Sequence, residues 1–246
     1  MNPMDAVAPP RDDSFRVMTS GAFTAAHVRL LPAVERLTGL RGVTVTTSIG
    51  SGDASIPNRL KRGEVADLVI CDDSIVQGFI REGLARAEGA APLARSCVGL
   101  AVRAGAPAPD ISTAEALRET LLRARAIGYS ASVSGRYVTT ELFQRLGIHD
   151  QVMPKCLFVG NGQRVGTFIA SGEVEIGFQQ VSELLPIEGI AHITPLPEAL
   201  QKYTLYSAAV AASAVHPEAA LKAIRFLASA EAAADISATG LEPAGG

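Results

Sequence analysis

The sequence predicts an α/β protein folded into two lobes. Three observations indicate this: the chain has 246 residues, strand and helix patterns alternate along it, and two successive α/β blocks are followed by a segment that can rejoin the first. Hydrophobic residues make up 48% and charged residues 19%, so a sizeable core can form. We expect lobe 1 at 15–95 plus 195–246, lobe 2 at 96–194, and a flexible tail at 1–14.

The first block alternates strands and helices three times. Apolar residues recur at helical spacing from residue 21 until Gly39 ends the helix, and β-branched residues alternate over 43–48. This order implies parallel strands linked by crossover helices. The predicted elements are strands 15–20, 43–48 and 66–73 and helices 21–39, 56–63 and 75–84.

The second block begins near Ser96 with a long apolar strand. Thr113 is expected to cap the next helix, Gly172 to close a later one, and Pro217 to occupy the first turn of the last helix. The predicted elements are strands 96–105, 126–130, 155–160, 174–180, 191–196 and 204–213 and helices 113–124, 134–148, 163–173 and 217–240.

Charge and composition exclude several classes of partner. The chain has 22 Lys and Arg against 25 Asp and Glu, with no basic run, so we expect no nucleic-acid binding. No stretch approaches the roughly 20 apolar residues of a membrane helix, and residues 1–14 lack the pattern of a secretory signal. We therefore expect a cytoplasmic protein without membrane insertion, or a periplasmic one if a leader was removed.

Motifs for metals and nucleotides are not found in the sequence. The three cysteines and four histidines lack metal-ligand spacing, and the glycine-rich loops match neither a P-loop nor a dinucleotide-binding fingerprint. We expect no cofactor and no metal.

Small polar residues follow four of the predicted strands. They lie at 19–21, 48–53, 130–136 and 160–163. Helix N-termini present free N–H groups and a partial positive charge, and ligands gather at the carboxyl ends of strands in open α/β sheets. Each junction alone is also an ordinary turn or cap. Together, the four junctions favour a pocket for a small anion such as a carboxylate or oxyanion.

The order of motifs from residue 15 to residue 243 resembles the periplasmic molybdate-binding proteins and their relatives. The matching pieces are the T-S-G-A-F turn, the G-S-G loop before IPNRLKRGE-ADL, the S-G-R-Y helix start, Q-R-V…ASGE-VEIG, and HPEAALKAIRFL…GLEP. The resemblance implies a type II periplasmic binding-protein fold, with a ligand cleft between the lobes.

The chain departs from molybdate binders at two of the positions that hold the dianion. Ser20 matches the first serine of that family, but Asp53 stands near the second, and Gln180 stands where a tyrosine is expected. A carboxylate facing the cleft would repel a dianion, whereas an Asp53 that merely caps its turn would not. Because side chains alternate along a strand, only one of Gln179 and Gln180 is expected to face the cleft, and the alignment favours Gln180.

Two arginines are further candidates. Arg59 and Arg136 each offer a planar fork that matches a carboxylate, although either is also explained as a solvated surface side chain. Asp53 is the predicted catalytic residue. The predicted substrate-binding residues are Ser20, Gly21, Ser51, Arg59, Ser134, Arg136, Gly162 and Gln180.

Two functions remain open from the sequence. The resemblance extends to aconitate isomerases built on this scaffold, which implies an isomerase that moves a double bond, or changes cis/trans geometry, in a small unsaturated di- or tricarboxylate. Asp53 would be the base, and no cofactor is required. The alternative is a solute-binding protein that delivers a small carboxylate or a molybdate-like oxyanion to an ABC permease.

Overall fold

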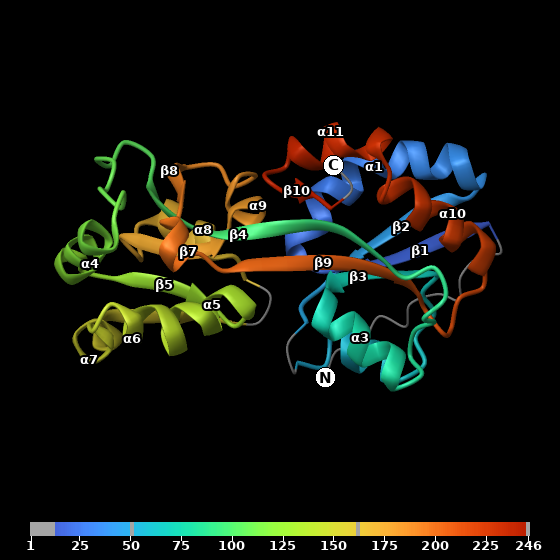
Figure 1. Cartoon of the computed structure of the whole chain (residues 1–246), viewed down its shortest axis with the longest axis horizontal. Helices are drawn as coiled ribbons and strands as arrows, with labels where there is room; N and C mark the ends of the chain where they lie inside the picture. Colours follow the sequence, from blue (N-terminus) through green and yellow to red (C-terminus); the bar gives the residue numbers. More distant parts are fainter. Residues whose placement is uncertain (1–12, 50–51, 161–162, 245–246) are drawn as a thin grey trace.

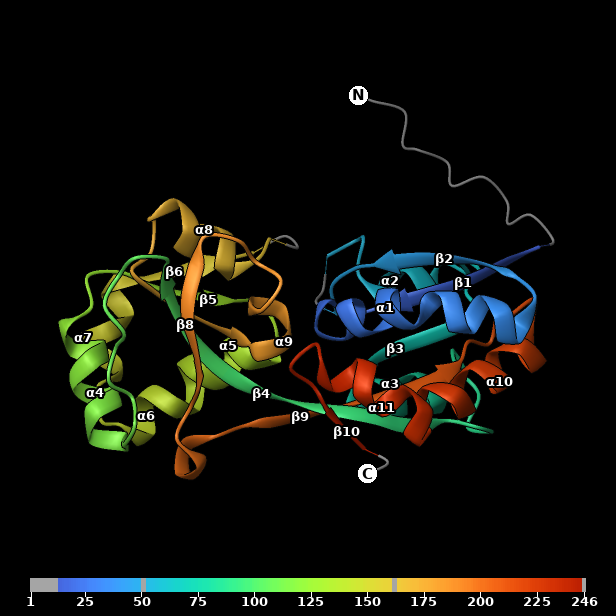
Figure 2. The same cartoon turned by 90° about the horizontal axis from the view of Figure 1, so that it is seen from above.

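The computed structural model describes residues 13–49, 52–160 and 163–244, which form two α/β lobes lying side by side (Figure 1). Two strands, β4 (Ala91–Arg103) and β9 (Tyr203–Val210), run between the lobes, and both are labelled in Figure 2. No helix in the described ranges is both long enough and apolar enough to span a bilayer.

Lobe 1 is built from the two ends of the chain. Its first three strands are parallel, with β1 between β2 and β3, as the crossover pattern predicts. Strand β9 then returns antiparallel to β3. The strands are β1 (Ser14–Thr19), β2 (Arg41–Thr46), β3 (Leu68–Asp72), β9 (Tyr203–Val210) and β10 (Glu242–Pro243). The helices are α1 (Gly21–Thr38), α2 (Ile56–Lys61), α3 (Asp73–Arg81), α10 (Pro217–Leu227) and α11 (Ala230–Ser237).

Lobe 2 has the same layered plan. Strands β5, β6 and β7 are parallel, and β7 and β8 pair antiparallel to the end of β4. The strands are β4 (Ala91–Arg103), β5 (Ile127–Ser130), β6 (Cys156–Val159), β7 (Ile176–Gln180) and β8 (Ile190–Pro195). The helices are α4 (Ala114–Arg123), α5 (Val133–Tyr137), η1 (Val138–Leu142), α6 (Phe143–Arg145), α7 (His149–Val152), η2 (Met153–Lys155), α8 (Val165–Ser171), α9 (Val181–Leu184) and η3 (Glu198–Leu200).

Strand β4 connects the lobes. Its first half pairs with β9 as far as Cys97, and from Val98 onward it pairs with β7. The crossing therefore lies one or two residues beyond the predicted boundary after residue 95. The return crossing is later than the predicted boundary at 194/195, because Leu196 and Leu200 pack in the core of lobe 2.

Each sheet buries apolar side chains on both faces. In lobe 1, α1, α10 and α11 lie on one face of the sheet and α3 on the other (Figure 1). One core lies beneath α1, α10 and α11, and a second lies on the side of α2 and α3. In lobe 2, one core lies under α4 to α7 and a second under α8 and α9. Covering both faces leaves the ends of the strands as the places where polar groups can gather.

The C-terminal helical segment differs from its prediction. Residues 217–240 form two helices, because Ser229 adopts an extended backbone and becomes the N-cap of α11. The sequence around it is rich in alanine and contains no glycine or proline that signals a break, so local propensity alone predicts one continuous helix.

A buried histidine lies on the inner face of α1. His27 shares this face with Phe23, Leu30 and Val34, and its side chain is fully buried. Neither ring nitrogen has a hydrogen-bond partner within the described part of the chain. Burial lowers the pKa of His27 from 6.5 to about 4, because the core cannot solvate an imidazolium ion.

We expect His27→Leu to remove part of the acid sensitivity of folding. Between pH 6.5 and pH 4 the unfolded chain protonates His27 while the folded chain does not, so stability falls as the pH falls through this window. The loss amounts to about 3 kcal/mol for a shift of this size. Urea unfolding at pH 7.5 and pH 5 should show a smaller difference for the variant than for the wild type. Equal differences would mean that His27 is not the responsible group.

Candidate functional site

The carboxyl end of β1 meets the N-terminus of α1 at Ser20. The backbone N–H of Ser20 donates to the carbonyl of Ile70 at 2.9 Å, which continues the pairing of β1 with β3 to the start of α1. The hydroxyl of Ser20 is buried and makes no hydrogen bond to any described residue. A buried hydroxyl without a partner is costly; this one lies at the start of a long helix, and the binding role of Ser20 stays a prediction.

Lobe 2 contacts this turn through α9. A methyl group on Gly21 would overlap Oε1 of Glu183, and one on Gly240 would overlap Leu185, next to α9. Glycine at both positions therefore lets α9 approach lobe 1 closely. We call the place where the two lobes meet, at Ser20, Gly21, Gln179 and Glu183, the lobe junction.

The side-chain amide of Gln179 lies beside the carboxyl group of Glu183. Its Oε1 accepts a 3.0 Å hydrogen bond from the backbone N–H of Val165, so its amide nitrogen is left to donate to Glu183. Part of the Glu183 side chain is exposed, but its carboxyl group is enclosed by protein atoms. This enclosure raises the pKa of Glu183 to about 7, even though Arg164 and Gln179 favour the ionised form and act to lower it.

Gln180 points the other way, as alternation along a strand requires. Its Nε2 donates to Oγ1 of Thr204 on β9 at 3.0 Å, and its Oε1 is buried without a partner among the described residues. Thr204 in turn hydrogen-bonds to Tyr206, whose pKa is raised well above its usual value by burial and by the negative charges of Glu183 and Asp72. Both glutamines thus lie near the lobe junction. Gln179 lies beside the carboxyl group of Glu183, and Gln180 lies beside Thr204 of β9.

A row of serines follows β5 in lobe 2. Ser130 and Ser132 are joined through their hydroxyls at 2.7 Å, and Ser132 and Ser134 at 2.9 Å. Ser134 is fully buried in the first turn of α5. We call Ser130, Ser132 and Ser134 the serine row. Because β5 and β7 are parallel neighbours, the serine row and the end of β7 lie at the same edge of the sheet.

The loop before α2 holds the predicted base. Asp53 lies in an exposed turn, in which the backbone N–H of Ser55 donates to the carbonyl of Gly52 at 2.8 Å. The neighbouring Ser55, not selected from the sequence, is the N-cap of α2, and its buried hydroxyl has no partner within the described ranges. Ser51 lies outside the described residues, as does Gly162. The catalytic role of Asp53 stays a prediction.

The two candidate arginines differ in their surroundings. Both Nε and Nη2 of Arg59 donate to the carboxylate of Glu64, which also faces Arg16 of β1 at 4.0 Å. This ion pair occupies the fork of Arg59 within lobe 1, and the binding role of Arg59 stays a prediction. Arg136 is exposed on α5, close in sequence to the serine row, and its binding role stays a prediction.

Sequence reasoning does not single out Glu183, and it favours Gln180 over Gln179. Glu183 follows a predicted strand by three residues, the same placement that drew attention to the other junctions. Nothing local distinguishes it from a solvated glutamate in a first helical turn. Its proximity to Gly21 comes from the packing of one lobe on the other.

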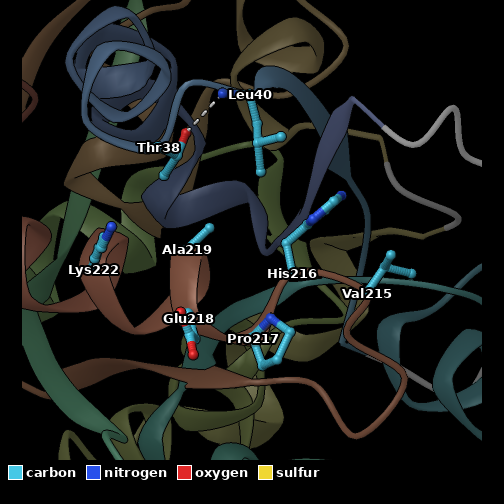
Figure 3. Close-up of a pocket in the computed structure, with 8 residues that line it drawn as sticks. All are labelled: Thr38, Leu40, Val215, His216, Pro217, Glu218, Ala219 and Lys222. Atoms are coloured by element: carbon cyan, nitrogen blue, oxygen red, sulfur yellow. Dashed lines mark hydrogen bonds between the residues drawn. The ribbon is translucent and has the colours of Figure 1, made fainter.

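A separate cavity lies at the opposite end of lobe 1. Figure 3 shows it between the end of α1 and the start of α10, where the Leu40 backbone N–H donates to the Thr38 hydroxyl at 3.3 Å. The length of α1, roughly 25 Å at 1.5 Å per residue, separates this cavity from the lobe junction. No group of three or more His, Cys, Asp or Glu side chains suited to a metal ion occurs in the described ranges.

Two α/β lobes joined by long strands, with polar groups where their strand ends meet, define the two-lobed periplasmic binding-protein class. The chain belongs to the bacterial extracellular solute-binding protein family, whose model matches residues 15–242. The predicted fold class and the family resemblance are therefore confirmed.

One similar protein carries the name of an enzyme. A Pseudomonas protein named aconitate isomerase is 37% identical over 228 residues, which cover 92% of this chain and 87% of that protein.

Solved structures of the same fold include binders of small anions. The periplasmic molybdate-binding protein of Azotobacter vinelandii has a TM-score of 0.75 and 17% identity, covering 92% of this chain and 98% of that one. The sulfate-binding protein SubI of Mycobacterium tuberculosis has a TM-score of 0.73 and 18% identity, covering 94% and 87%. PEB3 bound to L-phospholactate has a TM-score of 0.71 and 11% identity, covering 93% and 99%. These likenesses establish the fold.

Proposed function

We propose that this protein is an isomerase of a small unsaturated di- or tricarboxylate, with trans-aconitate as the first substrate to test. The observation that carries the proposal is the relative named aconitate isomerase, which is 37% identical over 92% of this chain. The site residues fit such a substrate. Several carboxylates need several donors, and both lobes place hydroxyl groups at the ends of their parallel strands.

The reaction requires only a proton transfer. A base removes a proton from the methylene group of one arm of the substrate, and the C–H electron pair spreads over the double bond and its carboxylates. A proton is then delivered to the former =CH carbon, at the other end of the allylic system, and the double bond forms at the deprotonated arm. Atoms and electrons balance without an oxidant or a cofactor. Donors that hold the carboxylates stabilise the charge that develops.

The family itself favours a second function, that of a solute-binding protein. The unpaired hydroxyl of Ser20 at the N-terminus of α1 suits an oxyanion as well as a carboxylate. In this case the protein would bind a small anion without changing it and would deliver it to an ABC permease.

Proton NMR of trans-aconitate with the purified protein in D₂O separates the two functions. We expect the cis isomer to appear, with deuterium entering the methylene position. The isomerase proposal fails if neither isomer nor deuterium appears for trans-aconitate or related unsaturated carboxylates. Thermal stabilisation by molybdate or sulfate in the same preparation would then support solute binding.

A further inference from the structure

We propose that Glu183 is the residue that moves the proton at the lobe junction. This inference rests on the proposed isomerase function and deepens it by naming the group that performs the transfer. The argument starts from position, since Glu183 belongs to lobe 2 but its carboxyl group lies against Gly21 of lobe 1.

This position faces the site where an anionic substrate is expected. Gly21 is the first residue of α1 and follows Ser20, whose buried hydroxyl has no partner in the described ranges. A ligand carboxylate held by Ser20 and the first N–H groups of α1 would lie next to the carboxyl of Glu183. The acidic methylene group of an aconitate-like substrate is bonded directly to a carboxylate carbon, so the base has to lie close to where that carboxylate is held.

The surroundings of Glu183 suit a group that both accepts and returns a proton. Gln179 holds the carboxyl on one side, and its own amide is fixed by Val165. Enclosure raises the pKa of Glu183 to about 7, with Arg164 limiting the rise. A carboxyl group with a pKa near neutrality is populated in both protonation states, which general acid–base catalysis requires.

The step is a shuttle by one carboxyl group. Ionised Glu183 takes the proton as the C–H bond of the methylene group breaks, and it becomes a neutral acid. Its acidic proton exchanges with the solvent, and the neutral acid then donates a proton to the other end of the allylic system and is ionised again. Because α9 contacts both Gly21 and Gly240 of lobe 1, the base is in place only when the two lobes are in contact.

The test compares matched variants of the full chain in the NMR assay. Glu183→Gln keeps the shape and loses the ability to accept a proton, so we expect isomerisation to fall by at least about a hundredfold. Binding of trans-aconitate, measured by titration calorimetry, should change only a few-fold. Glu188→Gln is the control, because it is the same substitution at an exposed position just after α9, and it should retain the wild-type rate.

The pH profile provides a second readout. The wild-type rate should rise with pH up to about 7, since Glu183 must be ionised to act as the base. Glu183→Asp should keep some activity and should shift the pH range over which the rate rises. The charged or titratable groups near Glu183 are Arg164 and Tyr206, with Asp72 beyond Tyr206. If Glu183 had only a structural role, the substitution would lower the rate but would leave the pH range of the rise unchanged.

The outcomes separate the inference from the function on which it rests. An active wild type with an equally active Glu183→Gln variant removes Glu183 and leaves the isomerase proposal standing. If Asp53→Asn instead abolishes turnover in that case, Asp53 is the base. A wild type that is inactive on every unsaturated carboxylate overturns the isomerase proposal, and the inference falls with it.

Discussion

Replacing Gly135 with alanine is expected to destabilise the protein by roughly 2 to 4 kcal/mol and to abolish ligand binding. A methyl group at this position would overlap the carbonyl oxygen of Ser130 and lie 2.7 Å from its carbonyl carbon and 2.8 Å from its nitrogen. These are backbone atoms at the end of β5, so they cannot move aside as the tip of a side chain can. The end of β5 and the first turn of α5 would have to separate, which would break up the serine row.

Urea unfolding measures the stability, and calorimetry with trans-aconitate measures the binding. Gly78→Ala is the matched control, because Gly78 lies inside α3 and the nearest atom to an added methyl group is the end of the Arg81 side chain, at 3.8 Å. Alanine favours the helix over glycine, so this control should be up to about 1 kcal/mol more stable than the wild type. A Gly135→Ala variant as stable as the wild type would contradict the close packing of α5 on β5.

Gly21→Ala is expected to impair turnover while leaving stability unchanged. The added methyl group would meet Oε1 of Glu183, which is the end of a flexible side chain and can move away. The first turn of α1 tolerates alanine well. The carboxyl would, however, be displaced by about an ångström, and a misplacement of that size costs roughly a hundredfold in rate.

The same two assays test this variant, with isomer formation followed by NMR and stability by urea unfolding. Gly78→Ala again serves as the control, since it adds the same methyl group far from the lobe junction. A Gly21→Ala variant with the full wild-type rate would show that the position of Glu183 against Gly21 does not matter for the reaction. Lost turnover with a large loss of stability would indicate a packing defect instead.

Much of the fold could be predicted from local sequence. The helix that begins at Gly21 ends as predicted, with Gly39 adopting a φ of 72° that favours glycine. The strand expected at 43–48 is found slightly earlier, at Arg41–Thr46. These elements depend on hydrophobic periodicity and on residues with particular backbone preferences, which are local properties.

The candidate site could be predicted only in part. Ser20 and Ser134 can be selected from the sequence because a hydroxyl residue at the end of a strand has a local pattern; both are buried at such ends, and their binding roles stay predictions. The geometry of its side chain makes Arg59 a candidate, but its partner Glu64 cannot be identified without the fold. Charged side chains have many possible partners at similar sequence separations, so pairing is decided by packing.

Local sequence patterns are enough to predict the two-lobed α/β class, the positions of most strands and helices, and the gathering of small polar residues after the strands. Hydrophobic periodicity, helix caps and glycine turns carry this information because they act over a few residues. The different partners of Gln179 and Gln180, and the position of Glu183 against Gly21, follow from the packing of the folded chain. Those contacts join segments far apart in the chain, and the enclosure that raises the pKa of Glu183 exists only once the two lobes have packed together.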